Sequence, residues 1–413
     1  MNSINLARLE GIENLDVTGK HVLLRADLNV PLADGSVSDP TRILRVVPTI
    51  QTLTDRGAKV VVLSHLGRPK GKLSSKLSLR PVADAMRAIL GGTPVRFVEE
   101  CVGPQAKTDI GELEEGEVAL LENLRFHPGE EANDADFARD LGRLGDIYVN
   151  DAFSCSHRAH ASIDTLATIL PAYAGRLMVA EIMALRTVLD APKHPVAAVI
   201  GGAKISTKIP VLTNLVDKVD LLIVGGGMAN TFLHAVGVDV GKSLHEPDFA
   251  ETAIEIMKRA KEAGCKIALP EDAVVAKKFE PGAVLGIFNI RHIPTDGMIL
   301  DVGPETVARL IDKITHCKTL LWNGPLGAFE MEPFGKGTSA LAHEAARLTK
   351  EDALVTVAGG GDTIAALNAA GVTDDFTYVS TAGGAFLEWI EGRELPGVVA
   401  LVRNQENQLA RSA

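Results

Sequence analysis

The sequence predicts an α/β protein with two domains, each built on a parallel sheet flanked by helices, and a helical linker between them. Short continuous apolar runs alternate with helix-like periodic segments along the 413 residues. This alternation is typical of βαβ units with buried parallel strands. It stops once near the middle of the chain and then restarts, and the length suits two domains of roughly 100–200 residues each.

The first half supplies the strands of one sheet. Its apolar runs of strand length are His21–Leu24, Lys59–Leu63, Val95–Val98, Val118–Leu121 and Ile147–Val149. Helical periodicity lies between them, for example at Ile43–Asp55 and Leu79–Leu90. We therefore expect an N-terminal domain over residues 1–171.

A helical pattern separates the halves. In Ala172–Asp190 the apolar residues Leu177, Ala180 and Val188 recur near the helical period, with Pro171 before the pattern and Pro192 after it. We expect one interdomain helix over residues 172–192 and a C-terminal domain over residues 193–394. The strand-like runs of that domain are Val196–Ile200, Leu221–Val224, Ile267–Leu269, Met298–Asp301, Thr319–Trp322, Leu354–Val357 and Tyr378–Ser380.

Composition excludes several classes of function. The formal net charge of −11 disfavours a nucleic-acid partner. No apolar run reaches the roughly 18 residues of a membrane span, and the N-terminus lacks the features of a secretory signal, so we expect a cytoplasmic protein without a membrane partner. Cysteines 101, 155, 265 and 317 are far apart, which argues against a zinc site and a disulfide framework.

Basic and polar residues follow the strands of the first half. They lie in Arg25–Pro31, Ser64–Pro69, Glu122–His127 and Asn150–His160. Ligands bind outside the carboxyl ends of parallel strands, and converging guanidinium groups suit a ligand with a phosphate and a carboxylate. The alternatives are an Asx-turn before Pro31 and solvated surface arginines.

Arg42 and the pair His157 and His160 each allow two interpretations. Arg42 follows the helix start Asp39-Pro40-Thr41 and is unfavourable there unless it faces an anion. His157 and His160 are spaced i, i+3 and could suggest a metal, but no third His lies near them in the sequence. We therefore favour a surface or anion-site role for the two histidines.

Glycines and lysines follow the strands of the second half. They lie in Gly201–Lys208, Gly225–Asn230, Trp322–Glu330, Gly359–Thr363 and Thr381–Ala385. Glycines let the backbone approach a ligand, and helix N-termini present N–H groups to anions. Lys204 and Lys208 would share one helix face. The Asp362 carboxylate suits a Mg²⁺ ion carried by a nucleotide, although Asp362 and Thr363 could also simply cap a helix.

Two common nucleotide-binding fingerprints are absent. After Gly225 and Gly227, the third position of a GxGxxG motif is occupied by Asn230. The segment Gly237–Ser243 is one residue short of a Walker loop. Neither a dinucleotide fold of the usual kind nor a P-loop is therefore predicted.

In order and spacing, these segments together resemble the phosphoglycerate kinase family over essentially the whole chain. The resemblance implies two Rossmann-like domains joined by a helix, with residues 395–413 packing back on the first domain. It also implies reversible Mg²⁺-dependent phosphoryl transfer between ATP and the carboxylate of 3-phosphoglycerate, which gives 1,3-bisphosphoglycerate and ADP in glycolysis and gluconeogenesis. An ionised carboxylate needs no general base, so the lack of a catalytic triad is no obstacle.

The same resemblance implies a set of site residues. The residues expected to hold 3-phosphoglycerate are Asp27, Asn29, Arg42, His65, Arg68, Arg125 and Arg158. Those expected to hold the nucleotide are Lys204, Lys208, Asn323, Glu330 (at the ribose), Gly360, Gly361, Asp362 (at the Mg²⁺ ion) and Thr363. We assign transition-state charge to Arg42 and Lys208, with backbone N–H groups of Gly360, Gly361 and Gly384 as further donors.

The chain departs from the family pattern at two places. Many members have Gly where Ala382 stands, and Gly-Thr-Ala where Ser154-Cys155-Ser156 stands. Neither change removes a charged group. We expect a monomer with small-molecule substrates only, and the alternatives are a hinged anion-binding protein without activity and a nicotinamide-dependent dehydrogenase.

The division of these residues predicts a closing motion. The arginine set belongs to the first half and the lysine and glycine set to the second, whereas reacting atoms must approach to about 3–3.5 Å. We expect the domains to swing together about the ends of the linker when both ligands are bound. Small-angle X-ray scattering should give a smaller radius of gyration with both substrates than with either one alone. An unchanged radius in the ternary complex would contradict this expectation.

Overall fold

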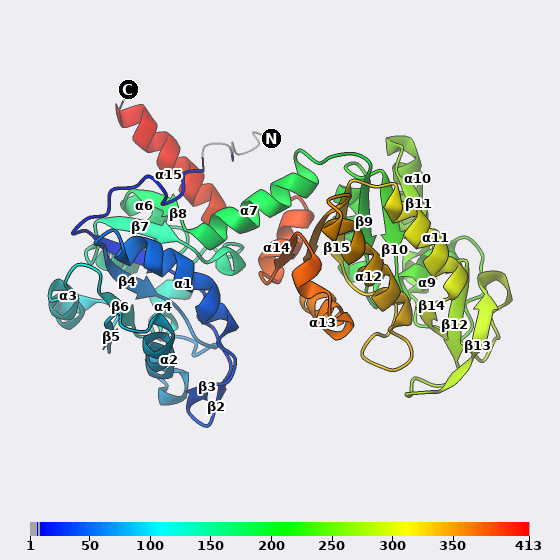
Figure 1. Cartoon of the computed structure of the whole chain (residues 1–413), viewed down its shortest axis with the longest axis horizontal. Coiled ribbons are helices and arrows are strands. Elements are labelled where there is room, and N and C mark those ends of the chain that lie inside the picture. The colour runs from blue at the N-terminus through cyan, green and yellow to red at the C-terminus, as the bar shows by residue number, and fades with distance from the viewer. Residues whose placement is uncertain (1–5, 7–8, 413) are drawn as a thin grey trace. The chain divides into compact units, whose positions relative to one another are not determined.

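The computed structural model describes Leu6 and residues 9–412 of the chain. The chain forms two compact units, shown in Figure 1. Unit 1 contains the described residues up to Ile182 and those from Glu394 onward, and unit 2 is Met183–Arg393. Each unit has one six-stranded parallel sheet, which confirms the predicted fold class. No helix of the described chain combines the length and the apolar composition that a membrane crossing requires.

The sheet of unit 1 has the strand order β5-β6-β4-β1-β7-β8. Its strands are β1 (His21–Arg25), β4 (Lys59–Leu63), β5 (Val95–Val98), β6 (Val118–Leu121), β7 (Ile147–Asn150) and β8 (Ala172–Ala174). All neighbouring strands pair in parallel. The five runs predicted from the sequence are therefore strands, and their carboxyl ends lie at one edge of the sheet.

Helices cover both faces of this sheet. Alternate strand residues such as Val22 and Leu24 pack in one core with apolar residues of α1 (Thr41–Thr54) and α2 (Arg80–Leu90). Leu23 is equally buried but points to the other face, as the two-residue period of a strand requires. The remaining elements of the unit are β2 (Leu32–Ala33), β3 (Ser36–Val37), η2 (Ser75–Leu77), α3 (Gly103–Gly111), η3 (Leu124–Phe126), α4 (Pro128–Glu131), α5 (Ala135–Gly142), η4 (Phe153–Cys155) and α6 (Leu166–Ile169).

The linker helix is shorter than predicted. Ala172–Ala174 forms strand β8 beside β7, and helix α7 begins only at Arg176 and ends at Leu189. Asp151 fixes the turn between β8 and α7. The Asp151 Oδ1 accepts a hydrogen bond from the Met178 N–H at 3.0 Å, and a side chain at position 175 would collide with the Asp151 carboxylate, so Gly175 is required there. The prediction of one helix from Ala172 was wrong because a three-residue strand is too short to leave a periodic signal.

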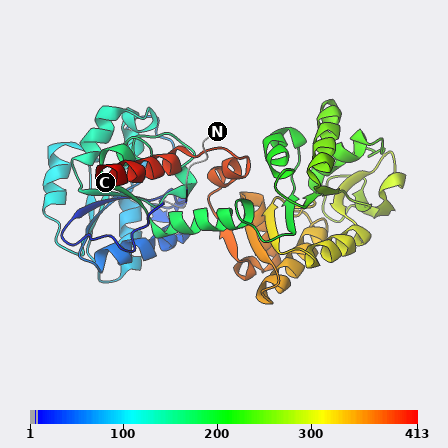
Figure 2. The ribbon, with the colours of Figure 1, turned by 90° about the horizontal axis from the view of Figure 1, so that it is seen from above.

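The C-terminal helix α15 (Pro396–Ser412) packs on unit 1 against α6 and β8, as the red helix in Figures 1 and 2 shows. Gln405 is 2% exposed and ties three backbone groups together. Its amide group donates to the carbonyls of Glu10 and Ala172 at 3.1 Å and accepts from the Glu10 N–H at 2.9 Å. The last helix therefore holds both the first described loop and strand β8.

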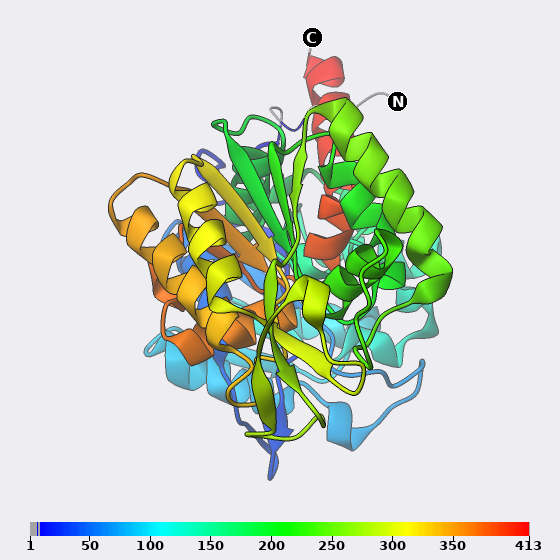
Figure 3. The same cartoon turned by 90° about the vertical axis from the view of Figure 1, so that its right-hand side faces the viewer.

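Unit 2 has a second parallel sheet, in the order β11-β10-β9-β15-β16-β17. Its strands are β9 (Val196–Ile200), β10 (Leu221–Val224), β11 (Lys266–Ala268), β15 (Thr319–Asn323), β16 (Val355–Gly359) and β17 (Tyr378–Ser380). Figure 3 shows helices α11 (Pro304–Thr315) and α12 (Lys336–Lys350) on one face and α9 (Gly226–Ala235) and α10 (Ala250–Ala263) on the other. The other helical elements are η5 (Ile205–Thr207), α8 (Ile209–Leu215), η6 (Pro247–Phe249), η7 (Ile290–His292), α13 (Gly361–Ala370), η8 (Thr373–Asp375) and α14 (Gly384–Ile390).

One predicted strand belongs to a different sheet. Met298–Asp301 lies in β14 (Met298–Val302), which pairs antiparallel with β12 (Asp272–Ala276). Strand β13 (Val284–Asn289) completes this three-stranded sheet on the other side of β12. The apolar run Met298–Asp301 was assigned to the parallel sheet because the composition of one strand does not reveal the direction of the neighbouring strand.

The buried hydrogen bonds of Gln405 predict a stability effect. Gln405→Ala should remove the side-chain partner of the Glu10 N–H and of the Ala172 carbonyl, while the Glu10 carbonyl keeps the Ala174 N–H at 3.0 Å. The free energy of unfolding of unit 1 should fall by about 1–3 kcal/mol. Denaturant unfolding together with amide hydrogen exchange at β8 measures this loss. The matched control Asn407→Ala removes an exposed amide from the same helix and should have little effect. Equal stabilities for the two variants would show that Gln405 does not hold the helix in place.

Candidate active site

A buried guanidinium group lies at the carboxyl end of β1. Arg25 is 1% exposed, and its Nε donates to Ser162 Oγ at 2.8 Å. The Ser162 hydroxyl in turn donates to Oε1 of the fully buried Glu130 at 2.6 Å. A buried charge is costly unless it is paired. Glu130, reached through Ser162, is therefore the compensating charge for Arg25.

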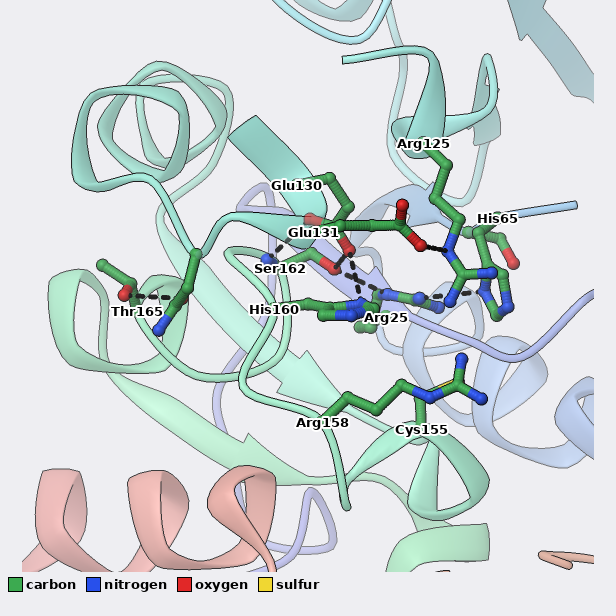
Figure 4. A network of polar contacts seen from close by, with 12 residues as sticks. Arg25, His65, Arg125, Glu130, Glu131, Cys155, Arg158, His160, Ser162 and Thr165 are labelled. Carbon is green, nitrogen blue, oxygen red and sulfur yellow. Dashed lines mark hydrogen bonds and ion pairs between the residues drawn. The ribbon is translucent and has the colours of Figure 1, made fainter. Parts of the chain in front are cut away.

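His65, directly after β4, lies among three arginines. Arg25 Nη2 donates to His65 Nδ1 at 3.1 Å. Burial lowers the pKa of His65 well below its ordinary value, and Arg25, Arg125 and Arg158 lower it further, while Asp27 opposes them. Figure 4 shows the three guanidinium groups directed towards the region around His65. The imidazole is therefore neutral at pH 7, and the arginines supply the positive charge.

Asp27 balances part of this charge. It forms an ion pair with Arg42 and accepts a hydrogen bond from Ser154 Oγ and another from the Asn29 N–H. Burial opposes the charged form of Asp27, but Arg42, Ser154 and the Asn29 N–H together hold its pKa below the ordinary value. Asp27 therefore supplies the anion that a first-turn arginine needs, and the Arg42 side chain remains 39% exposed towards solvent.

The loop after β4 joins more of the predicted residues. Asn29 Oδ1 accepts from the Gly67 N–H at 2.8 Å, and Arg125 Nη1 donates to the Gly67 carbonyl at 2.8 Å. Arg68 is exposed beside Gly67, and Arg158 donates to His157 Nε2 at 3.1 Å. The structure thus brings Asp27, Asn29, Arg42, His65, Arg125 and Arg158 into one region and leaves Arg68 at its exposed border.

The two histidines near Arg158 do not form a metal site. His157 accepts from Arg158, and His160 Nδ1 lies 3.9 Å from Glu130 Oε1. Among the described residues, neither belongs to a group of three possible ligands. The anion-site or surface role of the two histidines stays a prediction.

In unit 2 the glycine loops border a cavity of about 700 Å³. Its lining is largely apolar, with Ala203, Leu244 and Met298 among the side chains. Asp301, Glu330 and Asp362 contribute three carboxylates to the same lining. A cavity of this volume with few polar groups has the usual properties of a small-molecule site.

Lys208 and Asn323 form a buried polar network at the carboxyl ends of β15 and β16. Lys208 Nζ donates to Asn323 Oδ1 at 2.5 Å, and Asn323 Nδ2 donates to the Gly359 carbonyl at 2.7 Å. Thr363 Oγ1 accepts from the Gly324 N–H at 2.7 Å and donates to the Gly359 carbonyl at 2.9 Å. Burial lowers the pKa of Lys208, and Glu391 and Asp362 partly offset this effect. Asn323 and Thr363 are therefore engaged within the protein and position Lys208 and the loop.

The start of α13 is open to a ligand. Gly360 has φ +102°, and a side chain there would meet Asn323 Nδ2 at 2.6 Å, so the position requires glycine. Gly361 and Asp362 are exposed in the first turn, and no side chain caps the helix. Gly384 begins α14, which packs against α8, the helix that follows Lys208. Backbone N–H groups and one carboxylate thus border the region near Lys208.

Lys204 does not share a helix face with Lys208, contrary to prediction. Lys204 has extended backbone, a short 3-10 turn follows it, and α8 begins only after Lys208. Ser206 breaks the helix by binding Glu246, to which it donates from both its N–H and its hydroxyl at 2.9 and 2.7 Å. Lys204 is exposed and acts electrostatically on Glu246.

Sequence reasoning missed several residues of the site. Ser162 and Glu130 lie far from Arg25 in sequence, so nothing in the local pattern joins them. Ser154 was noted only as a departure, yet its hydroxyl binds Asp27. The other departure, Ala382, is buried and has no positive φ, so its methyl group fits without backbone strain.

Comparisons with known proteins identify the family. The phosphoglycerate kinase family model matches residues 12–393. The chain is 60% identical over 386 residues to the phosphoglycerate kinase of Chelativorans sp. (strain BNC1), covering 94% of this chain and 97% of that protein. It is also 60% identical to that of Methylorubrum extorquens (strain PA1) over 383 residues, covering 93% and 96%. The chain belongs to the phosphoglycerate kinase family.

Solved structures of the family agree with this assignment. Phosphoglycerate kinase from Coxiella burnetii is 41% identical, with a TM-score of 0.89 over 96% of this chain and 99% of that chain. Phosphoglycerate kinase from Pyrococcus horikoshii OT3 is 32% identical, with a TM-score of 0.80 over 97% and 100%. The chain has phosphoglycerate kinase activity in glycolysis and gluconeogenesis and is a phosphotransferase with a carboxyl acceptor. The family resemblance is confirmed, and the binding-protein and dehydrogenase alternatives are excluded.

A buried carboxyl at the cavity predicts a pH effect. Asp301 is 1% exposed, lines the cavity, and accepts from the N–H groups of Val302 and Gly337 at 2.9 Å. Burial raises the pKa of Asp301 to about 7, although those N–H groups favour the charged form. Its contribution to stability is therefore fully present below an unfolded pKa of about 3.9 and is lost as pH rises through about 7.

Asp301→Asn removes this titration. From pH 4 to pH 8 the wild type should lose on the order of 2–4 kcal/mol of stability relative to the variant. Tryptophan fluorescence reports on unit 2, because Trp322 and Trp389 are the two tryptophans of the chain. Asp248→Asn, at an exposed position, is the control. A difference between wild type and Asp301→Asn that does not change with pH would contradict the prediction.

Proposed function

We propose that unit 1 binds 3-phosphoglycerate at the carboxyl edge of its sheet and that unit 2 binds the Mg²⁺ nucleotide at its own. The observation that carries the proposal is the cluster of Arg25, Arg125 and Arg158 around a neutral His65 in a chain of net charge −11. Such a local excess of guanidinium groups favours an anion. The proposal keeps the domains expected from the sequence, which are residues 1–171 with 395–413, the linker 172–192 and residues 193–394. The two compact units of the structure meet in sequence inside α7, between Ile182 and Met183.

The chemistry of 3-phosphoglycerate suits the unit 1 cluster. Its phosphate and carboxylate accept hydrogen bonds and match the guanidinium geometry of Arg68, Arg125 and Arg158. Its hydroxyl is its one donor, and Asp27 is a carboxylate in this region that can accept from it. Asn29 and His65 border the same space and complete the substrate contacts, while Arg42 lies between Asp27 and solvent.

The cavity of unit 2 suits a nucleotide. Its apolar lining favours an aromatic base, and the Glu330 carboxylate can accept from the two hydroxyls of a ribose. The residues proposed for the phosphates are Lys204, Lys208, Gly360, Gly361 and Thr363, the last through its backbone N–H because its hydroxyl is engaged. Asn323 acts by orienting Lys208.

The residues present also fit a magnesium ion. Asp362 is exposed, lines the cavity, and offers the oxygen ligand that Mg²⁺ prefers. When bound, the ion neutralises phosphate charge. Asp362 would hold it, and the electrostatic effect of Asp362 on Lys208 indicates that the two groups lie near one another.

In the proposed mechanism the protein positions two anions and stabilises charge. The substrate carboxylate is already ionised at pH 7, so no residue has to remove a proton. Arg42 and Lys208 stabilise charge on the transferring phosphoryl group, and the N–H groups of Gly360, Gly361 and Gly384 supply preorganised donors. A monomeric state and a cytoplasmic location remain predictions.

A coupled assay tests the assignment of the sites. ATP-dependent turnover of 3-phosphoglycerate should require Mg²⁺, and inorganic sulfate should compete with 3-phosphoglycerate at the arginine cluster. Binding of 3-phosphoglycerate that is unaffected by Arg125→Ala and Arg158→Ala would contradict the proposed substrate site.

Arg42→Ala should lower kcat by roughly 10³–10⁵, the range for loss of a charge-stabilising arginine. Nucleotide affinity should change little. The control Arg87→Ala removes an arginine that is also partly exposed but lies in α2 and pairs with Asp84. If Arg42 served only as the partner of Asp27, KM for 3-phosphoglycerate would rise and kcat would stay within tenfold of wild type.

Asp362→Ala should weaken binding of the Mg²⁺ nucleotide and leave 3-phosphoglycerate affinity unchanged. Titration of both ligands by calorimetry checks this, with Asp374→Ala as an exposed control in the same unit. A purely capping role would instead cost about 0.5–2 kcal/mol of stability. Normal nucleotide affinity with such a loss of stability would contradict the metal role.

A further inference from the structure

A second group of polar side chains lies at the other end of the same sheet edge in unit 1. Glu100 and Cys101 follow β5, and His127 follows the 3-10 turn after β6. One carboxylate oxygen, the Cys101 Sγ and one His127 nitrogen all lie within 4.8 Å of one another. No residue of this group takes part in the proposed reaction.

The group is held in place by its surroundings. His127 Nε2 lies 2.7 Å from Glu100 Oε1, which also accepts from the Cys101 N–H at 2.7 Å. The His127 ring stacks on Phe137 with centroids 5.0 Å apart and 24° between the planes. The Cys101 thiol points to the Glu122 carbonyl at 2.9 Å. Protein contacts therefore hold the three potential ligand atoms close to one another.

The charges around the group favour a cation. The Cys101 thiol is buried and lies in the field of three carboxylates, those of Glu100, Glu122 and Glu130. A comparable group, Asp27, His65 and Cys155, lies in the substrate region. That group faces Arg25, Arg125 and Arg158, which would repel a cation. Of these two groups, the one at Cys101 is the electrostatically suitable metal site.

We propose that Glu100, Cys101 and His127 bind one Zn²⁺ ion, or a divalent transition metal of similar chemistry. A carboxylate oxygen, a thiolate and an imidazole nitrogen are all ligands that Zn²⁺ takes. His127 and Glu100 are 28% and 44% exposed, so a water molecule can reach the fourth position. Tetrahedral bonds of about 2.0–2.3 Å place ligand atoms about 3.3–3.8 Å apart, which requires side-chain shifts of about 1 Å.

The ligand set distinguishes this ion from the Mg²⁺ of the reaction. Mg²⁺ prefers oxygen ligands in octahedral geometry, so a thiolate and an imidazole select against it. Coordination replaces the proton of the Cys101 thiol, so affinity should rise with pH. The site was not foreseen from the cysteine spacing, because its ligands come from two separate strand ends.

Calorimetric titration of the metal-free full chain with Zn²⁺ in excess Mg²⁺ tests the proposal. One ion should bind per chain, and the melting temperature should rise. Titration with Co²⁺ should produce a sulfur-to-cobalt charge-transfer band. Cys101→Ser and His127→Ala should each weaken binding by at least about tenfold, and Cys101→Ser should abolish the band.

Two control variants locate the site. Cys155→Ser removes the thiol of the other group, and Cys265→Ser removes a buried thiol in unit 2, so both should keep wild-type Zn²⁺ affinity and the band. His127→Ala changes a partly exposed side chain and keeps the test valid if Cys101→Ser does not fold. The proposal is overturned if wild type binds Zn²⁺ no more tightly than His127→Ala, or if Cys155→Ser removes the band.

Discussion

The common direction of the strands is the constraint on which both units depend. Because every neighbouring pair in the two six-stranded sheets is parallel, all strand ends of one polarity meet at one edge. Residues that follow β1, β4, β6 and β7 are therefore brought together although they are far apart in sequence. The same constraint gathers the glycine loops after β9, β10, β15 and β16. The polar side chains and glycine loops of each unit therefore gather at the carboxyl edge of its sheet.

Charge at the unit 1 edge is organised by burial. The guanidinium group of Arg25 is buried, so its positive charge needs a nearby negative charge. Glu130 supplies that charge through Ser162. Burial and the neighbouring arginines lower the pKa of His65, so its imidazole is neutral. Asp27 stays charged beside Arg42, because it also accepts hydrogen bonds from Ser154 and the Asn29 N–H. A ligand anion would therefore enter a field that the protein has already arranged.

The sequence predicts the parallel strands well because each carries a continuous apolar run, and it predicts the polar strand ends because Arg, His and Asp are conspicuous there. The sequence does not predict elements whose structure depends on residues far away along the chain. β8 is a strand because β7 lies beside it, β14 pairs antiparallel with β12, and Ser206 breaks the helix by binding the distant Glu246. Nor does a local pattern join Arg25 to Glu130. The family resemblance supplied residue roles that periodicity alone does not contain.

The position of α15 has a consequence for the order in which the chain folds during synthesis. Unit 2 is continuous in sequence, so all of its residues have been synthesised before translation ends. Unit 1 is discontinuous, and the Glu10 N–H and the Ala172 carbonyl form their hydrogen bonds with Gln405 only after residue 405 has been synthesised. The Glu10 N–H is therefore among the groups of unit 1 that reach their final hydrogen bonds late, because its partner lies 395 positions later in the sequence. A nascent chain truncated before residue 405 would contain a complete unit 2 and an incomplete unit 1.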